Sequence, residues 1–463
     1  MDLTIIGLGP GDSALLTTEA REILDSATEV YLRTRHHPLV PSLPAHLTLH
    51  SFDHLYESAE DFCAVYEEIA KQVLQLARRP EGVIYAVPGH PLVGEESVRR
   101  ILALARGEGL KVRIVVGLSF IEAALVPLEI DPLNGLQIVD ATVLATRLHP
   151  NLDPDLPVLV GQLYSRRLAA EVKLTLMNLY PADHVVTLVR KVGTPDAKTE
   201  TLPLQELDHL KDIDHLTSLY LPSLPNPSSL STFQDIVARL RAPGGCPWDR
   251  EQTHQTLRPH LLEETYEVLE ALDKEDDVAL REELGDLLLQ IVLHTQIAVE
   301  DGEFTFAQVL ETIIAKIIRR HPHVFGGLEV ADAADVLRNW QAIKQAEKPQ
   351  EEKVLWGTPR SLPALSLAQR AQQRAEQAGL ASPTREKLLA DVYKRLSKLK
   401  EIRDRDQAAR ELGQLLFALA DLGRHLGVDT ESALRGATTQ FGEAQTRGQS
   451  PVGTPDDDGC PTG

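Results

Sequence analysis

Residues 261–294 have the sequence LLEETYEVLEALDKEDDVALREELGDLLLQIVLH. Leucine and valine recur three or four positions apart in both halves of this stretch, which is the spacing of one helix face. A polar run at 273–277 interrupts the pattern, so we expect two antiparallel helices joined by a turn. This helical hairpin predicts an all-helical fold for the part of the chain around it.

Four carboxylates share the inward face of the expected hairpin. Glu264 and Glu267 lie three residues apart on its first helix, and Glu283 and Asp286 lie three apart on its second. Carboxylates gathered beside a core repel one another and lose hydration, and a hard cation offsets both penalties. Magnesium suits such a site because it takes a few carboxylates, keeps waters and binds substrate phosphates. The pattern favours a magnesium centre over a solvated acidic face, with Gly285 where we expect the helices to approach closely.

The hairpin belongs to a long helix-patterned region, residues 231–441, with few β-branched runs. Its motif Glu-Leu-Gly-Asp-Leu-Leu at 283–288 recurs as Glu-Leu-Gly-Gln-Leu-Leu at 411–416, which indicates two copies of one helical unit. Basic residues at 394–398 replace the acidic pair of the first copy. We interpret the second copy as a structural repeat that supports folding or dimerisation and has no catalytic role.

The first ~220 residues alternate β-branched runs with helical stretches, which predicts an α/β domain with a largely parallel sheet. The expected strands lie at 3–6, 83–87, 112–116, 158–160 and 184–189. A Gly-Pro-Gly turn at 9–11 follows the first strand, and a helix is expected from about Thr17 to Asp25. Because Pro10 lacks the N–H that a phosphate cradle uses, the turn favours a ligand lying against the backbone over a pyrophosphate.

Composition excludes several classes of function. The net charge of −21 argues against a surface for nucleic acid or anionic lipid, although a small anionic substrate remains compatible. There is no run of 18 apolar residues, so we expect no membrane span. The three cysteines lie far apart without a CxxC pair, which fits a reducing cytoplasm and argues against a disulfide framework or a zinc site.

The C-terminal pattern resembles the MazG family of nucleotide pyrophosphohydrolases, whose hallmark is ExxE, a spacer and ExxD. Supporting motifs are GCPWD at 245–249, QTH at 252–254, KIIRRHPHVF at 316–325, and Trp340 with Lys344. The resemblance implies an all-α dimer that hydrolyses nucleoside triphosphates to monophosphate and pyrophosphate with Mg²⁺. It implies the metal ligands Glu264, Glu267, Glu283 and Asp286, an additional catalytic acid, Glu263, and the substrate contacts Trp248, Lys316, Arg320, Trp340 and Lys344.

The N-terminal pattern resembles the tetrapyrrole (corrin and porphyrin) methylases, which open with GxGPGDxxLLT and bind S-adenosylmethionine between two α/β lobes. Matching segments are GLGPGD at 7–12, AVPGHP at 86–91 and VVGLS at 115–119. The resemblance implies the cofactor-binding residues Gly9, Pro10, Gly89, His90 and Ser119. The stretch RTRHHP at 33–38 is closer to YabN-type fusion proteins than to the biosynthetic enzymes, so a tetrapyrrole acceptor is not implied.

The fold class expected is therefore a two-lobed α/β methylase-like domain followed by all-α MazG-type helical domains. The boundaries are a methylase-like domain at 1–220, a linker at 221–232, an intact MazG domain at 233–347, a linker at 348–362, a degenerate repeat at 363–445 and a disordered tail at 446–463. Nucleotide hydrolysis is the leading hypothesis. The alternatives are a methyltransferase with an accessory helical domain and a nucleotide sensor without catalytic function.

Overall fold

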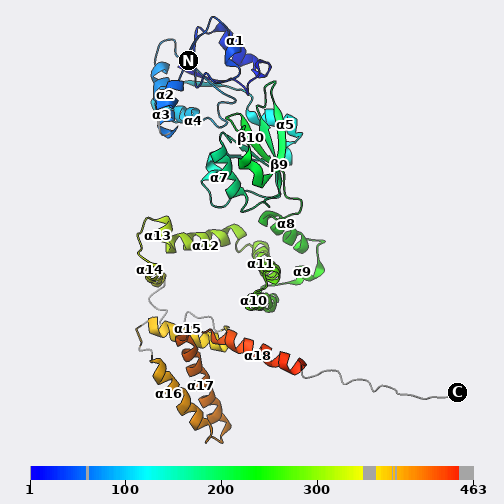
Figure 1. The fold of residues 1–463 in the computed structure, drawn as a ribbon, viewed down its shortest axis with the longest axis vertical. Coiled ribbons are helices and arrows are strands. Elements are labelled where there is room, and N and C mark those ends of the chain that lie inside the picture. Colours follow the sequence, from blue (N-terminus) through cyan, green and yellow to red (C-terminus); the bar gives the residue numbers. More distant parts are fainter. Residues whose placement is uncertain (1, 59–61, 348–360, 378, 381–382, 448–463) are drawn as a thin grey trace, which may run out of the picture. The chain divides into compact units, whose positions relative to one another are not determined.

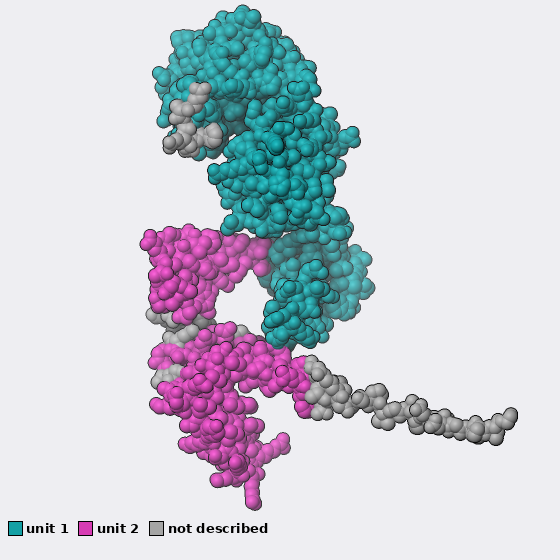
Figure 2. All heavy atoms as spheres, viewed as in Figure 1, with its two compact units in different colours: residues 1–306 teal, residues 307–463 magenta. Residues whose placement is uncertain are grey.

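The computed structural model describes residues 2–58, 62–347, 361–377, 379–380 and 383–447. The chain divides into two compact units, residues 1–306 and 307–463, which Figure 2 colours separately. No helix among the described residues combines the length and the apolar character needed to cross a membrane.

The first lobe of unit 1 is built on a parallel five-stranded sheet in the order β3-β2-β4-β1-β5. Figure 1 labels the helices α1 to α4 of this lobe. Apolar residues on both faces of the strands are buried, one set under α3 and α4 and another beside α1. The elements are β1 (Leu3–Gly7), α1 (Thr18–Ser26), β2 (Glu29–Leu32), β3 (Thr48–Ser51), α2 (Asp53–Ser58), α3 (Phe62–Ala77), β4 (Val83–Val87), α4 (Glu96–Glu108) and β5 (Val112–Val115). The predicted strands at 3–6, 83–87 and 112–116 and the first helix are confirmed.

The second lobe has a mixed sheet in the order β6-β7-β10-β8-β9. Only β6 and β7 pair in parallel, while β10 runs antiparallel to both β7 and β8, and β8 runs antiparallel to β9. The expectation of a largely parallel sheet therefore holds for the first lobe alone. The elements are α5 (Phe120–Leu128), β6 (Gln137–Asp140), α6 (Ala141–Ala145), β7 (Val158–Gly161), α7 (Arg166–Leu176), β8 (Val185–Arg190), β9 (Lys198–Pro203) and β10 (Thr217–Leu221).

The polypeptide is helical after β10, as its periodicity predicted. Unit 1 continues with α8 (Leu230–Arg241), α9 (Pro247–Glu251), α10 (Arg258–Asp273) and α11 (Asp277–Glu300). Unit 2 contains α12 (Phe306–Arg320, whose first residue belongs to unit 1), α13 (Pro322–Phe325), α14 (Ala333–Ala346), α15 (Ala364–Gln377), α16 (Arg385–Leu399), α17 (Arg405–His425) and α18 (Thr430–Arg447). Most of the predicted linker at 348–362 and of the predicted tail at 446–463 lies outside the described residues.

The start of α8 is attached to the second lobe by hydrogen bonds. Asp155, in the loop between β6 and β7, accepts from the backbone N–H groups of Ser228 at 2.7 Å and Ser229 at 3.2 Å. The hydroxyl of Ser231 donates to Asp153 at 2.6 Å, and the Ser229 hydroxyl caps the helix by accepting from the N–H of Thr232. Helix α8 therefore begins inside the range predicted as linker, with its first turn fixed.

Candidate active site

Helices α10 and α11 pack against each other as the predicted hairpin. Lys274 ends α10, and Glu275 takes a positive φ of 54° that reverses the chain. Asp276 then caps α11, because its carboxylate accepts from the N–H groups of Val278 and Ala279 at 3.0 Å each. The polar run at 273–277 thus supplies both the turn and the cap that the hairpin needs.

Three of the four predicted metal ligands come together across the hairpin. Carboxylate oxygens of Glu264, Glu267 and Glu283 all lie within 4.8 Å of one another. Burial raises the pKa of Glu264, and a hydrogen bond to Glu267 and the negative charges around it raise it further. Burial likewise raises the pKa of Glu283, together with the charges of Glu267 and Asp286. The raised pKa values reflect repulsion among neighbouring acids, and carboxylate oxygens gathered in this way could hold a divalent cation.

The remaining acids lie beside this cluster. Asp286 is outside the 4.8 Å group, yet its charge acts on the pKa of both Glu264 and Glu283. Glu263 is exposed, and its carboxylate lies 3.7 Å from Nδ1 of His260. The expectation for Gly285 is wrong, because a Cβ built there would meet nothing within 4 Å. The glycine faces open space, and side chains at neighbouring positions make the contact between the helices.

One buried glutamine and two half-buried histidines near the hairpin acids had no role in the sequence interpretation. Gln290 is buried on α11, and its amide nitrogen lies 3.5 Å from a Glu264 carboxylate oxygen. One turn further along α11, His294 stacks on His254. Their ring centroids are 5.1 Å apart, and their Nδ1 atoms are 2.8 Å apart. Burial and the neighbouring His254 lower the pKa of His294. A glutamine and a histidine one turn apart on an apolar helix face were the available signal.

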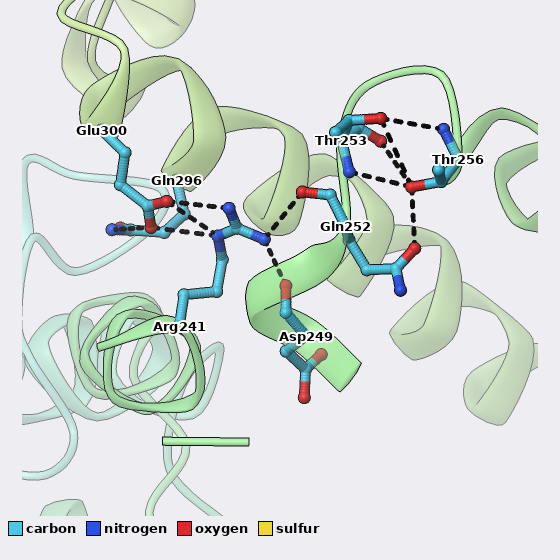
Figure 3. A network of polar contacts seen from close by, with 7 residues as sticks. All are labelled: Arg241, Asp249, Gln252, Thr253, Thr256, Gln296 and Glu300. Carbon is cyan, nitrogen blue, oxygen red and sulfur yellow. Dashed lines mark hydrogen bonds and ion pairs between the residues drawn. The ribbon is translucent and has the colours of Figure 1, made fainter. Parts of the chain in front are cut away.

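Arg241 is hydrogen-bonded to Asp249 and Gln252 (Figure 3). Asp249 belongs to α9, the short helix that also contains the predicted substrate contact Trp248. The Arg241 guanidinium pairs with Glu300 at the end of α11 at 2.8 Å and donates to the backbone oxygens of Asp249 and Gln252. Gln252 in turn donates to the carbonyl of Trp248 at 2.9 Å. This network stabilises the segment before α10.

Trp248 itself is 52% exposed, and its ring meets that of His260 edge-on with centroids 5.9 Å apart. His260 in turn lies 3.7 Å from Glu263, the acid next to Glu264 in the sequence, so one histidine contacts both the indole and Glu263. An exposed aromatic ring in this place is available to a planar ligand.

Three of the predicted substrate contacts come together in unit 2. The Arg320 guanidinium lies over the Trp340 ring at 5.6 Å from its centroid, and the Lys344 ammonium lies over it at 4.6 Å. Lys316 lies one helical turn before Arg320 on α12. Sequence reasoning missed Glu347, which directly follows α14 and accepts from Arg319 at 2.7 Å and from Arg320 at 2.5 Å. These two arginines lower the pKa of Glu347 to about 2.

The second helical repeat also forms a helical hairpin, and basic side chains there pair with its remaining acid. Helices α16 and α17 pack together, and Glu411 on α17 takes the place of Glu283 in the repeated motif. Arg395 and Lys398 on α16 lie 3.5 Å and 3.3 Å from the Glu411 carboxylate. Fixed cations thus neutralise the acid that remains in this copy.

Glycines at three strand ends of the first lobe form a close backbone junction. Gly9 and Gly89 exchange hydrogen bonds, with N to O distances of 3.2 and 2.9 Å. A Cβ at Gly7 would lie 2.5 Å from the carbonyl oxygen of Gly89, and one at Gly117 would lie 2.4 Å from the same atom. His37, which the sequence interpretation missed, donates from Nε2 to the Gly9 carbonyl at 3.0 Å, and burial lowers its pKa to about 4. The junction is packed backbone against backbone, with Gly7, Gly9 and Gly117 buried. It lies at the carboxyl edge of a parallel sheet, which is a typical ligand position in α/β domains.

The other predicted cofactor residues have visible structural roles. Pro10 packs against Gly193 of the second lobe, where an added Cβ would lie 2.4 Å from the proline ring. The His90 ring accepts from the N–H of Leu92 at 3.0 Å. The Ser119 hydroxyl caps α5 and bonds to Glu122 at 2.6 Å. The five residues Gly9, Pro10, Gly89, His90 and Ser119 come from the loops after β1, β4 and β5, and their cofactor contacts stay a prediction.

Comparison with known proteins agrees with this division of the chain. Residues 2–208 match the tetrapyrrole (corrin/porphyrin) methylases, and residues 252–325 match the MazG nucleotide pyrophosphohydrolase domain. The uncharacterized protein YabN of Bacillus subtilis is 40% identical over 449 residues, which are 95% of this chain and 91% of that protein. The nucleoside triphosphate pyrophosphohydrolase/pyrophosphatase MazG of Thermotoga maritima is 45% identical over 215 residues, 46% of this chain and 83% of that protein.

Among solved structures, the uroporphyrin-III-C-methyltransferase of Thermus thermophilus aligns with a TM-score of 0.38 at 19% identity, covering 48% of this chain and 94% of that one. The domains and the carboxylate hairpin together define an enzyme of the hydrolase class, with a methylase-type domain preceding a nucleotide pyrophosphohydrolase domain. The chain belongs to the YabN family, to which it is related over nearly its whole length.

Proposed function

We propose that this protein hydrolyses nucleoside triphosphates to nucleoside monophosphate and pyrophosphate at the α10–α11 hairpin with Mg²⁺. The observation that carries the proposal is the cluster of Glu264, Glu267 and Glu283 within 4.8 Å, with raised pKa values at Glu264 and Glu283. The relatives named for this activity match the helical part of the chain.

The metal would be held by Glu264, Glu267, Glu283 and Asp286. When bound, magnesium polarises a phosphoryl oxygen and lowers the pKa of a coordinated water. Glu263, exposed beside the cluster and 3.7 Å from Nδ1 of His260, would orient the attacking water. Gln290 would hold one oxygen of Glu264 and leave the other for the cation.

Basic and aromatic side chains would bind the nucleotide. Arg320 and Lys316 share one face of α12 and would contact the triphosphate. Trp340, which has Arg320 and Lys344 over its ring, and the exposed Trp248 would provide flat surfaces for the base or ribose. The substrates proposed are therefore nucleoside triphosphates, canonical or damaged.

The N-terminal domain would bind S-adenosylmethionine against the glycine junction. The close packing of Gly7, Gly89 and Gly117 brings the loops after β1, β4 and β5 together at the carboxyl edge of the sheet, where ligands of α/β domains commonly bind. S-adenosylmethionine supplies an electrophilic methyl group when bound. A second activity as a methyltransferase is therefore part of the proposal.

We further propose a homodimer formed through the helical region of a cytoplasmic protein. The α10–α11 hairpin exposes Leu262, Leu284, Leu288 and Ile291 by 53%, 49%, 38% and 41% of their surfaces. Together with the bare Gly285, these residues form an apolar surface suited to a second copy of the chain. We also propose that the methylase-like domain spans 1–220 and the catalytic MazG domain 233–347, and that residues 363–445 are a structural repeat without catalytic function.

The test is magnesium-dependent release of pyrophosphate over a panel of nucleoside triphosphates. E264Q and E283Q should each reduce kcat by at least about a hundredfold, because each removes a ligand charge from the metal centre. E411Q, the matched change in the second hairpin, should leave the rate unchanged. Activity that survives E264Q and E283Q would refute the proposal, and nucleotide binding without turnover by the wild-type protein would favour a sensor.

A second measurement addresses the methyltransferase alternative. Calorimetry of the full chain with S-adenosylmethionine should show heat of binding that E264Q leaves unchanged. Absence of both heat and thermal shift would remove the methylase part of the proposal and leave the hydrolase part standing.

A further inference from the structure

Two histidines join the α10–α11 hairpin at the end away from its turn. His254 lies four residues before α10 begins at Arg258, and His294 lies six residues before α11 ends at Glu300. Their Nδ1 atoms are 2.8 Å apart, and their ring planes differ by 5°. Two imidazole nitrogens this close share a hydrogen bond, so one Nδ1 carries a proton and the other accepts it. The bond ties the segment that enters α10 to the second half of α11.

The surroundings of the histidine pair keep this bond intact at neutral pH. Both rings are half-buried, and burial and the neighbouring His254 lower the pKa of His294. A neutral ring can accept at one nitrogen, whereas two charged rings would both donate and would repel each other. The lowered pKa keeps the His294 ring neutral, as the bond requires.

The acids between the turn and the histidine pair oppose close approach of the two helices. Carboxylate oxygens of Glu264 and Glu267 on α10 lie within 4.8 Å of one on Glu283 of α11. Burial and the charges of neighbouring acids raise the pKa values of Glu264 and Glu283, and the second of these causes is mutual repulsion. Leu284 and Leu288, on the same stretch of α11, are 49% and 38% exposed, so apolar burial offsets little of this repulsion locally.

Buried apolar contacts of the hairpin lie at the histidine end. Leu257, three residues after His254, is buried in one cluster with Val292 and Leu293, the two residues before His294. Aliphatic packing is non-directional and permits small sliding of one helix along the other. A hydrogen bond between two rings is directional and fixes one relative position. The histidine pair therefore sets where α10 begins relative to α11.

A second polar contact connects this end of the hairpin with the acids. Gln290 lies one turn before His294 on α11 and is 5% exposed, and its amide nitrogen lies 3.5 Å from a Glu264 carboxylate oxygen. If α10 moved along α11, Glu264 would change its distance to Gln290 and to Glu283 together. The positions of the acids thus depend on the relative position that the histidine pair fixes.

We infer that His254 and His294 are positioning residues, which hold Glu264 and Glu267 opposite Glu283 in the metal-free protein. The inference rests on the proposed hydrolase function, because it gives the pair a part in preparing that metal site. Neither histidine is a proposed ligand, and the pair acts through the helices that carry the ligands. With the carboxylates already gathered, a cation binds without the cost of bringing two repelling helix faces together. Loss of the hydrogen bond should therefore weaken metal binding while every ligand is retained.

Mn²⁺ binding to the full chain, measured by electron paramagnetic resonance, tests the inference. H254F and H294F remove the hydrogen bond and keep an aromatic ring, and each should weaken Mn²⁺ binding at least about tenfold. H254N places an amide where Nδ1 lies, so it can still bond to His294 and should keep the affinity within about threefold of wild type. In turnover at saturating Mg²⁺, none of these changes should alter the KM for nucleoside triphosphate, whose proposed contacts are other residues.

H425F is the control for replacing a half-buried histidine. His425 on α17 bonds through Nδ1 to the Asp421 carbonyl at 3.0 Å, and it lies in the repeat for which no ligands are proposed. This change should leave Mn²⁺ affinity as in wild type. Thermal unfolding in chelator checks that each variant is folded, and H254F, whose substitution lies outside both helices, carries the test if H294F does not fold.

The expected pattern is weak Mn²⁺ binding in H254F and H294F with near-normal binding in H254N and H425F. Wild-type affinity in folded H254F, or equal losses in H254N and H254F, would overturn the inference and leave the proposed hydrolase site standing. Mn²⁺ binding that E264Q does not weaken would refute the metal site of the proposed function, and the inference with it.

Discussion

Arg320 donates through Nε and Nη2 to the carboxylate of Glu347, at 3.1 and 2.5 Å to the same oxygen. Arg319 donates to the other oxygen at 2.7 Å, so one acid holds two neighbouring arginines. Carboxylates and phosphates present similar oxygen pairs to guanidinium groups. Glu347 therefore occupies a position that the proposed function assigns to a substrate phosphate.

E347Q should lower the KM for nucleoside triphosphate about twofold to fivefold with kcat unchanged, which is the size expected for releasing a solvent-accessible ion pair. The measurement is steady-state kinetics of pyrophosphate release. E376Q, which removes the partner of Arg424 in the second hairpin, is the control and should not alter KM. A higher KM in E347Q would mean that Glu347 orients the arginines for the substrate and does not compete with it.

The carboxylate cluster should make stability depend on pH and on metal. Glu264 and Glu283 have pKa values raised above 4.5 in the folded chain, so folding binds protons there. Their contribution is present at low pH and is lost as pH rises through the raised values. In chelator, Tm should therefore fall as pH increases above about 4.5, and Mg²⁺ at pH 7.5 should reverse the loss.

Scanning calorimetry of wild type and of E264Q/E283Q separates the contribution of these two glutamates to the pH dependence of Tm from that of the other titratable groups. The double variant should show a flatter pH dependence and little response to Mg²⁺. An unchanged response to Mg²⁺ would place the cation elsewhere.

Acidic residues can be put in place of the basic residues that pair with Glu411 in the second hairpin. Replacing Arg395, Lys398 and Gln414 by Glu, Glu and Asp restores the acidic pattern of the first hairpin. This triple variant should bind more Mn²⁺ per chain than wild type, as counted by electron paramagnetic resonance, because Glu411 would lose its fixed cations. K394E/K400E changes charge on the same segment without touching those pairs and should leave the stoichiometry unchanged. The same count in the triple variant would contradict the charge argument.

Adding a single methyl group at the glycine junction should destabilise the first lobe. G7A or G117A places a Cβ about 2.5 Å from the Gly89 carbonyl, and such overpacking costs roughly 1–3 kcal/mol. Both variants should lower the unfolding free energy and abolish the heat of S-adenosylmethionine binding. G107A is the matched control: its Cβ meets nothing within 4 Å inside α4, so it should stabilise by about 1 kcal/mol. Full ligand binding by a folded G117A would exclude this junction as the cofactor site.

The apolar surface of the first hairpin provides a test of assembly. L288E puts a charge on the surface proposed for a second copy, and it should shift the protein from dimer to monomer in sedimentation velocity. L104E, at a surface position of α4 in the first lobe that is 45% exposed, is the control. A dimer that persists in L288E would place the interface elsewhere.

The parts of the fold that depend on local periodicity were predictable. The helical hairpin and the pairing of Glu264 with Glu267 follow from residues three or four apart, which adjacent turns bring together. By contrast, β9 contains Lys198, Thr199 and Glu200, all exposed, and its alternation carries no apolar signal. The buried strand β10, which runs antiparallel to β7 and β8, was not predicted either, because strand direction depends on pairing between distant segments.

Contacts between distant residues were not predictable from one sequence. Glu347 lies 27 positions from Arg320, and His294 lies 40 from His254, so neither pairing leaves a local pattern. Gly285 misled because glycine within a helix marks close packing only where a neighbour is present, and none lies within 4 Å. Whether Gly285 faces the other helix or solvent depends on how the two helices of the hairpin pack, which the sequence does not specify locally.

Helix α8 is held at both ends. Its first turn is bonded to Asp155 of the second lobe, and Arg241 at its last turn is bonded to Glu300 of α11. Twelve residues of helix span about 18 Å, and an intact helix of this length resists bending. Over this segment the methylase lobe and the carboxylate hairpin are connected by a helix bonded at both ends, so a substitution at Asp155 or Glu300 would release one end of that helix.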